Sequence, residues 1–198
     1  MVARSGHPDQ LTPRDSYQEA VRQGALKDYW QKRWGRAGEF AGWLTEANLP
    51  SLSLEQAIAL YQASGGRRGA EFRSNTLEDI RDSLDFLLYD TIKLESRFDE
   101  CVSEGGSYQL AGAGKEFMSY LLCLRQPALL GVWNASAERA LRVLGSYPGT
   151  LRKGHWGLRY LDLLEALQRV RLRFQLADFR EVDLFAYWVA KSARASSI

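Results

Sequence analysis

The sequence contains few of the side chains on which metal and thiol chemistry depends. It has two cysteines, two histidines and two methionines among its 198 residues. Cys101 and Cys123 lack the paired spacing of a zinc site or a disulfide framework, and His7 and His155 lie far apart in the chain. We therefore expect no metal site formed by these residues, and a reducing, cytoplasmic compartment.

Long apolar runs are also absent. No run approaches the roughly 18 residues that a membrane-spanning helix needs, so we expect no membrane partner. Residues 1–14 lack the apolar middle of a signal peptide. We expect them to form a flexible arm before one domain that covers residues 15–198. No phosphate-binding loop, dinucleotide fingerprint or nucleophile elbow occurs, which argues against phosphoryl-transfer and redox chemistry.

Charge is nearly balanced, with 26 basic and 24 acidic residues and a formal net charge of +2. A strongly basic footprint, typical of many nucleic-acid binders, is missing. Basic residues nevertheless cluster locally: over residues 22–36, at Arg67 and Arg68 in a glycine loop, and at Arg152, Lys153 and His155. Such clusters are either solvated surface or contacts for an anionic partner, and the sequence alone leaves both interpretations open.

The hydrophobic pattern has helical periodicity nearly throughout and predicts an all-α fold of about eight helices. Two segments begin with the spacing of a capping box, at Ser53 with Gln56 and at Asn75 with Glu78. We expect helices over about residues 15–34, 37–47, 53–64, 75–90, 92–103, 115–126, 137–145, 156–175 and 182–193. The glycines, prolines and many arginines fall in the connections, where function is expected.

A glycine turn precedes the helix predicted at residues 115–126. It reads "LAGAG" over residues 110–114, with Gly112 and Gly114 one residue apart. Glycine tolerates positive φ and lets the backbone approach a ligand closely. Amide N–H groups before a helix N-terminus favour anions such as phosphate, and Lys115 would add positive charge. Joining two helices is the simpler role for the same turn.

The stretch over residues 110–145 resembles the helix–hairpin–helix (HhH-GPD) DNA glycosylases of the endonuclease III type. Residues 110–114 resemble the glycine hairpin of that family. "VWN" at residues 132–134 occupies the place of its aspartate motif, and "RALRVLG" at residues 139–145 resembles the helix that follows. More loosely, residues 43–145 are similar to helical modules found near restriction and phage-defence genes. The helix–hairpin–helix would cover about residues 95–126.

The resemblance implies a protein that acts on double-stranded DNA as a monomer. In the family, hairpin amides hold a DNA phosphate, the target base is flipped into a pocket, and its glycosidic bond is cut. It also implies that Gly112, Gly114 and Lys115 contact DNA, with Arg152 and Lys153 as further phosphate contacts. No cofactor is required beyond a monovalent cation that the hairpin would hold. The substrate would be a modified or damaged base, including bases of modified phage DNA.

The chain departs from the family at two catalytic positions. Asn134 stands at the place of the aspartate, and Glu116 stands at the place of the lysine that forms a Schiff base in some members. Lys115 lies one residue earlier, about 100° around the helix. We therefore expect no lyase activity. Glu116 or Asp162 would supply the negative charge at the sugar.

Three interpretations stay open for the matched block. In the first, Asn134 orients a water or a sugar oxygen in a monofunctional glycosylase. In the second, Asn134 only caps its helix and the protein binds DNA without cutting it. In the third, the chain is a helical interaction module and the match is coincidental. Four aromatic residues are candidates for the walls of a base pocket, because aromatic rings stack on extruded bases: Trp133, Tyr108, Tyr120 and Trp156.

Overall fold

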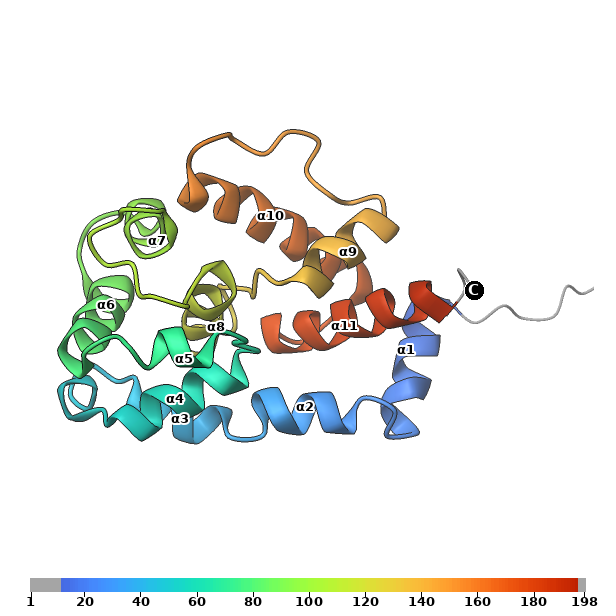
Figure 1. The fold of residues 1–198 in the computed structure, drawn as a ribbon. Helices are drawn as coiled ribbons and strands as arrows, with labels where there is room; N and C mark the ends of the chain where they lie inside the picture. The colour runs from blue at the N-terminus through green and yellow to red at the C-terminus, as the bar shows by residue number, and fades with distance from the viewer. Residues whose placement is uncertain (1–11, 196–198) are drawn as a thin grey trace, which may run out of the picture.

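Every regular element in residues 12–195, the part of the chain that the computed structural model describes, is a helix (Figure 1). These residues form a single all-α domain, as predicted. The elements are α1 (Pro13–Arg22), α2 (Lys27–Trp34), α3 (Ala37–Trp43), a 3-10 helix η1 (Leu49–Ser51), α4 (Leu54–Ala63), α5 (Gly69–Phe72), α6 (Leu77–Tyr89), α7 (Leu94–Val102), α8 (Lys115–Arg125), α9 (Ala135–Val143), α10 (Trp156–Phe174) and α11 (Phe179–Ala195).

The N-terminal part of the chain differs from the prediction in two ways. Most of the expected arm lies outside the described residues. Pro13 and Arg14, which were assigned to the arm, belong to α1, and this helix begins with a capping box at Thr12. The single helix expected over residues 15–34 is two helices. Gly24 has a φ of +74°, a left-handed conformation that ends a helix. The chain then starts again as α2.

One of the two predicted capping boxes is confirmed and the other is wrong. Ser53 and Gln56 cap α4 reciprocally. At α6, by contrast, Thr76 is the N-cap, and its hydroxyl accepts a hydrogen bond of 3.0 Å from the Asp79 amide. The Asn75 side chain instead bonds both backbone groups of Ala111, at 2.8 and 3.0 Å. It therefore ties the start of α6 to the glycine turn.

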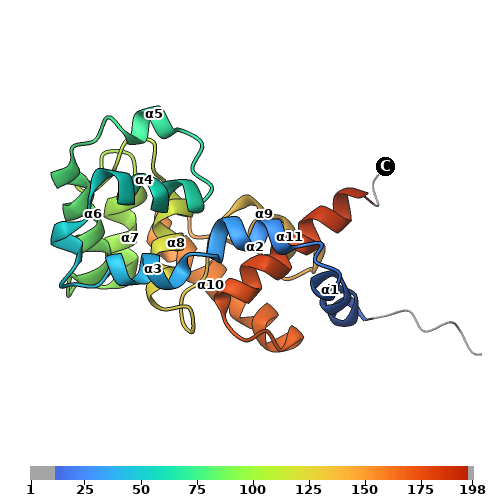
Figure 2. The same ribbon diagram turned by 90° about the horizontal axis from the view of Figure 1, so that it is seen from below.

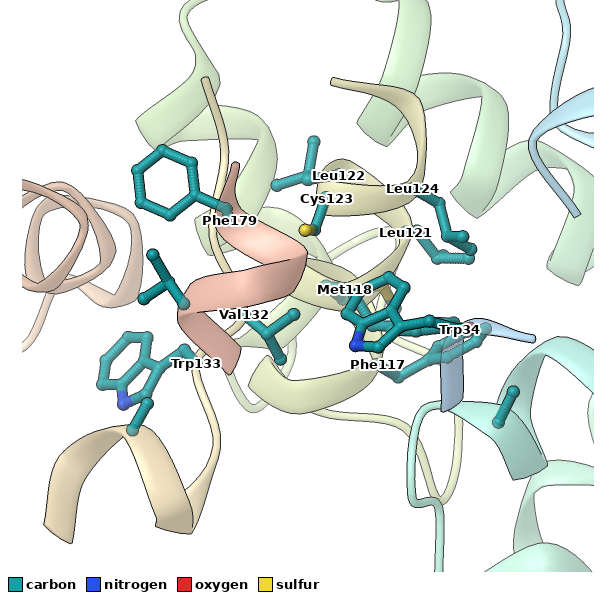
Figure 3. Packing of buried hydrophobic residues seen from close by; sticks show 14 of the residues in the cluster. Trp34, Phe117, Met118, Leu121, Leu122, Cys123, Leu124, Val132, Trp133 and Phe179 are labelled. Carbon is teal, nitrogen blue, oxygen red and sulfur yellow. The ribbon is translucent and has the colours of Figure 1, made fainter. Parts of the chain in front are cut away.

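Helix α8 forms the centre of the core. All of its residues from Phe117 to Leu124 are buried, so apolar neighbours surround it rather than contact one face. Figures 1 and 2 show α8 between α6 and α7 on one side and α10 and α11 on the other. Figure 3 shows Trp34, Val132 and Phe179 packed close to it. Cys123 is one of its fully buried residues, as expected for a small core side chain.

The segment predicted as helix–hairpin–helix contains α7 and α8, which pack on each other. The connection between them covers residues 103–114 and includes Gly105 and Gly112, both with positive φ. Two helices with a glycine turn therefore occur where the sequence places them. That they form the hairpin unit of the glycosylase fold stays a prediction.

Helix α10 packs tightly on α7 at Gly157. A Cβ atom at this glycine would lie 1.8 Å from the backbone oxygen of Glu95. We expect Gly157→Ala to lower the free energy of unfolding by about 1–3 kcal/mol, because the two helices must separate. Gly38→Ala is the matched control: its Cβ would meet no atom within 4 Å on α3, and helix propensity predicts a gain of up to about 1 kcal/mol. Urea denaturation measures both, and equal effects would contradict the steric argument.

Candidate functional site: a hollow between two glycine loops

Two glycine loops from distant parts of the sequence border one hollow of about 360 Å³. One loop joins α4 to α5 and contains Arg67 and Arg68. The other is the glycine turn before α8. The residues that line the hollow are Tyr61, Gly65, Gly66, Arg67, Arg68, Gly112, Gly114, Lys115, Glu116, Phe117 and Ala135. The volume falls within the range of small-molecule sites, about 300–1,000 Å³.

Gly112 holds the two loops together. Its φ is +74°, and a Cβ would lie 2.7 Å from the Phe72 amide nitrogen and 2.8 Å from the Arg68 carbonyl oxygen. The Tyr61 hydroxyl donates to the Gly112 carbonyl at 2.8 Å and accepts from the Arg68 amide at 3.1 Å. Only glycine fits this conformation and this contact without strain. Gly112 therefore shapes the hollow.

Gly114 leaves the start of α8 open to the hollow. It is the N-cap residue, with extended backbone and no side chain to cap the helix. A Cβ at this position would meet no atom within 4 Å. The first-turn N–H groups of a helix lack intrahelical partners, and the helix dipole adds positive potential there. The turn therefore offers main-chain donors to an anion.

Three carbonyl groups of the same turn already accept hydrogen bonds. The Leu110 carbonyl accepts from the Ala113 amide at 3.1 Å, the Ala111 carbonyl from Asn75 at 3.0 Å and the Gly112 carbonyl from Tyr61 at 2.8 Å. A monovalent cation would compete with these bonds for main-chain oxygens. The monovalent cation that the family resemblance implies stays a prediction.

Glu116 is the carboxylate of the hollow. Its side chain is 39% exposed, and Arg33 Nη2 lies 3.3 Å from its Oε1. Burial raises the pKa of Glu116, and the negative charge of Asp183 raises it further, whereas Arg33 and Arg67 pull it down. A carboxyl group with a raised pKa is suited to exchange a proton near neutral pH. The Gly65 backbone lies so close that a Cβ would stand 3.1 Å from Oε1.

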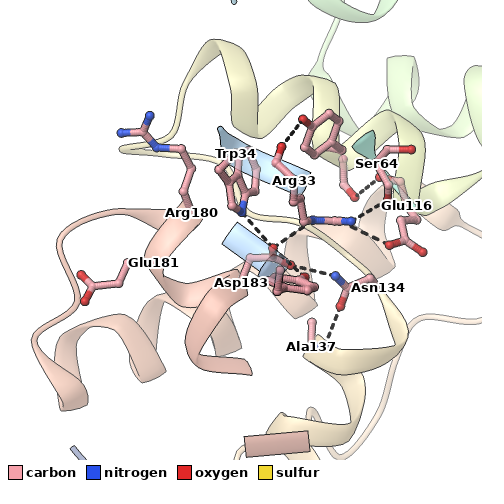
Figure 4. Close-up of polar contacts among 12 residues, drawn as sticks. Arg33, Trp34, Ser64, Glu116, Asn134, Ala137, Arg180, Glu181 and Asp183 are labelled. Carbon is pink, nitrogen blue, oxygen red and sulfur yellow. Dashed lines mark hydrogen bonds and ion pairs between the residues drawn. The ribbon is translucent and has the colours of Figure 1, made fainter. Parts of the chain in front are cut away.

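Arg33 contacts Glu116 from the protein interior and is itself buried. Its Nη1 donates to the Ser64 carbonyl at 2.6 Å, and its Nε lies 2.9 Å from Asp183 Oδ2 (Figure 4). Burial alone would lower the pKa of Arg33, but the attraction of Asp183 and of the neighbouring Tyr29 and Glu116 raises it overall. The guanidinium is therefore charged at every pH at which the protein is folded.

Asp183 on α11 is the counterion at the centre of this network. It is 3% exposed. Besides its ion pair with Arg33, it accepts hydrogen bonds from Tyr29 Oη at 2.9 Å, Trp34 Nε1 at 3.1 Å and Asn134 Nδ2 at 2.8 Å. Buried carboxylates persist when their oxygens are satisfied in this way. The network connects α2, α8, α9 and α11.

Asn134 belongs to this network and not to the surface of the hollow. It is 5% exposed. Its Oδ1 accepts from the Ala137 amide at 2.7 Å, which caps α9, and its Nδ2 donates to Asp183. Both ends of the amide are therefore occupied. This corrects the expectation that Asn134 presents its amide to a sugar or a water, and it favours the interpretation as a helix cap.

Lys115 lines the hollow, but acidic and aromatic neighbours engage its ammonium group. The group forms an ion pair with Glu138 on α9 and lies 4.4 Å from the centroid of the Trp133 ring. Its remaining exposure is 31%. A lysine with these partners adds positive charge at the rim.

The four aromatic candidates do not form the walls of this hollow. Trp133 and Tyr120 are fully buried, and the Tyr120 hydroxyl donates to the Arg33 carbonyl at 2.7 Å. The Tyr108 ring stacks on the ring of Phe86 in α6, and the two ring centroids lie 3.8 Å apart. Trp156 is half-buried and packs against Trp133, with 5.6 Å between the two ring centroids. The expectation that these rings border an open base pocket is corrected here: the rings that line the hollow are Tyr61 and Phe117.

The basic cluster before α10 is also separate from the hollow. Arg152 pairs with Asp162 at 2.7 Å, and Lys153 is exposed in the connecting segment. None of the three lines the hollow. Asp162 is therefore not brought to the glycine turn, which removes it as a second acid for that site. Arg152 and Lys153 remain predicted DNA contacts on a neighbouring part of the surface.

Four charged residues of the site were not among the predicted site residues. Arg67 and Arg68 could have been assigned from the sequence, because they directly follow the Gly65-Gly66 pair. Asp183 is the one acid in the apolar stretch "VDLFAYW", a pattern that indicates a paired buried charge. Nothing in the sequence shows that its partner is Arg33.

The fold and the site define an all-helical protein with a basic hollow that contains one partly buried carboxylate. No protein-family model, no curated protein and no solved structure matches the chain. Among residues 12–195, no helix has the length and apolar character to cross a membrane. The same residues bring no three His, Cys, Asp or Glu side chains together as metal ligands.

Proposed function

We propose that the protein is a monofunctional DNA glycosylase that excises a modified or damaged base, including bases of modified phage DNA, and leaves an abasic site. The observation that carries the proposal is that the glycine turn, two arginines and Glu116 line one hollow. Main-chain donors and a carboxylate at one place are what a phosphate-anchored, cation-stabilising site requires. The proposal also rests on the resemblance of residues 110–145.

Each part of the hollow has a chemical role in this proposal. The first-turn amides of α8, together with Arg67, hold a backbone phosphate of double-stranded DNA, whereas Arg68 is already paired with Glu71. The flipped nucleotide enters the hollow. Glu116 takes a proton from the attacking water as the water oxygen bonds to C1′ of the sugar and the bond between C1′ and the base breaks. The departing base then takes that proton from Glu116. The carboxylate also stabilises the positive charge that develops on the sugar. Lys115 stays paired with Glu138, which agrees with hydrolysis without a Schiff base.

The proposal is tested by incubation of the protein with duplex DNAs that carry different base modifications, followed by detection of abasic sites. The expected result is excision from at least one of them, with binding that weakens steeply as salt increases. Phage DNA with modified bases is the first natural substrate to compare with unmodified DNA. No excision from the whole panel would overturn the catalytic part of the proposal.

A binding module that does not cut DNA is the second candidate, and the burial of Asn134 favours it. The position that corresponds to the catalytic aspartate of the family is a helix cap in this structure. A binding module predicts salt-sensitive affinity for DNA but no abasic sites. The same two assays therefore separate the two candidates.

Gly114→Val is expected to weaken DNA binding by about tenfold to a hundredfold with little loss of stability. The valine side chain would cover the amides before α8, and a hydrogen bond to a charged group contributes about 1.5–3 kcal/mol. The extended backbone of Gly114 accepts a side chain. Gly38→Val on α3 is the control, because this glycine also has open space around it. Fluorescence anisotropy with labelled duplex DNA measures both, and equal affinities would exclude the turn as the phosphate site.

A further inference from the structure

Three charged side chains from three helices form a chain of contacts that ends in the hollow. Asp183 on α11 lies 2.9 Å from Arg33 on α2, and Arg33 lies 3.3 Å from Glu116 on α8. The side chains of Asp183 and Arg33 are 1% and 5% exposed, whereas the side chain of Glu116 is 39% exposed. Glu116 is the outermost member and also lines the hollow; Figure 4 shows the three side chains together.

We propose that Arg33 and Asp183 are positioning residues: Asp183 fixes the Arg33 guanidinium, and Arg33 in turn fixes the Glu116 carboxylate at the floor of the hollow. This inference rests on the proposed function, since it concerns the same carboxylate. It goes further because it assigns a role to two buried residues that touch no substrate. These residues control the orientation and the ionisation of Glu116.

Contacts with other residues fix the position of the Arg33 guanidinium. Its Nη1 is held by the Ser64 carbonyl, and its Nε forms an ion pair with Asp183 but no hydrogen bond with any described residue. The Tyr120 ring lies 5.2 Å from its Cζ atom, with Tyr29 and Trp34 both at 5.9 Å. The remaining nitrogen, Nη2, is the one that contacts Glu116. The planar group therefore presents Nη2 toward Glu116.

Opposite charges act on Glu116 from the surrounding elements. Arg33 on α2 and Arg67 before α5 favour the ionised carboxylate, while burial and Asp183 on α11 disfavour it. Two further groups near Glu116 already have partners. Lys115, which lies on α8 like Glu116, forms an ion pair with Glu138 on α9. The Tyr29 hydroxyl donates to Asp183. Arg33 and Asp183 thus have effects of opposite sign on the same carboxyl group.

The test is a carbon-13 NMR titration of glutamate side-chain carboxyls in the full chain, with the Glu116 signal assigned by Glu116→Gln. In Asp183→Asn, the midpoint of the Glu116 titration is expected to move to lower pH, because a repelling charge is lost. In Arg33→Met it is expected to move to higher pH, because an attracting charge is lost. A purely structural role would move both midpoints in one direction or neither, and either result would overturn the proposal.

The double variant Arg33→Met/Asp183→Leu covers the case in which a single variant does not fold. Replacement of a buried pair by apolar side chains is often neutral for stability. Arg33 lies nearer to Glu116 and has the larger effect on it, so the Glu116 midpoint is expected to move to higher pH. An unchanged midpoint in the folded double variant would overturn the proposal.

The pH profile of excision separates this inference from the proposed function. With an active glycosylase, the acidic limb of the kcat/KM profile is expected to shift in each variant in the same direction as the Glu116 midpoint. Opposite NMR shifts without any excision would support the positioning pair and contradict the glycosylase. Excision whose acidic limb does not move in either variant would support the glycosylase and overturn the positioning pair.

Discussion

Asp183→Ala is expected to lower the free energy of unfolding by about 3–5 kcal/mol, because it leaves Arg33 as a buried charge without its main counterion. It also removes the acceptor for Tyr29, Trp34 and Asn134, which are hydrogen-bonded to this carboxylate. Urea denaturation at neutral pH, followed by tryptophan fluorescence, measures the loss.

Asp162→Ala is the matched control for this prediction. Asp162 also forms an ion pair with an arginine, at 2.7 Å, but Arg152 is 55% exposed. Exposed ion pairs contribute little to stability. We expect no measurable shift of the denaturation midpoint in the control. A shift of the same size in both variants would show that burial does not determine the effect.

Glu116→Gln is expected to reduce excision by a factor of about 10²–10³, the effect of removing one electrostatic stabiliser from a catalytic site. Glutamine keeps the shape of the side chain but can neither carry the negative charge nor accept a proton from water. Single-turnover release of base from the substrate found in the panel measures the rate. Glu78→Gln on the exposed side of α6 is the control and is expected to leave the rate unchanged.

Glu116→Gln is also expected to remain folded. The direction of its effect on the free energy of unfolding follows from the raised pKa of Glu116. Burial holds the pKa of Glu116 above its usual value, so the native state binds more protons than the unfolded chain between those two values. The free energy of unfolding therefore falls as pH rises through that interval. Glu116→Gln lacks this slope and should be no less stable at neutral pH. Wild-type excision by Glu116→Gln would show that another group performs the chemistry.

Local sequence patterns predicted most of the helices. In the apolar stripe of α6, Ile80, Leu84 and Leu87 are buried, and Leu77 and Leu88 are half-buried. The cap of α9 at Asn134 was also predictable, because asparagine favours that position. The break at Gly24 was missed, since apolar periodicity continues across it and only the backbone conformation reveals the end of the helix.

The candidate site was predictable only where its parts are adjacent in the chain. Gly112, Gly114 and Glu116 lie within five residues, so one motif contains them all. Arg33 and Asp183 come from opposite ends of the sequence, and their contact depends on how α2 and α11 pack on α8. Aromatic residues misled the prediction for a related reason: Trp133 follows a loop in sequence but points into the core.

The hydrogen bond between Asn134 and Asp183 restricts which residues these two positions accept together. The donor and acceptor atoms lie 2.8 Å apart in a dry interior. Two acids at that separation could not both be ionised, and two amides would leave Arg33 without its neutralising partner. The fold therefore accommodates a single acid across the pair. A chain of this architecture with aspartate in place of Asn134 would need a compensating neutral side chain on α11.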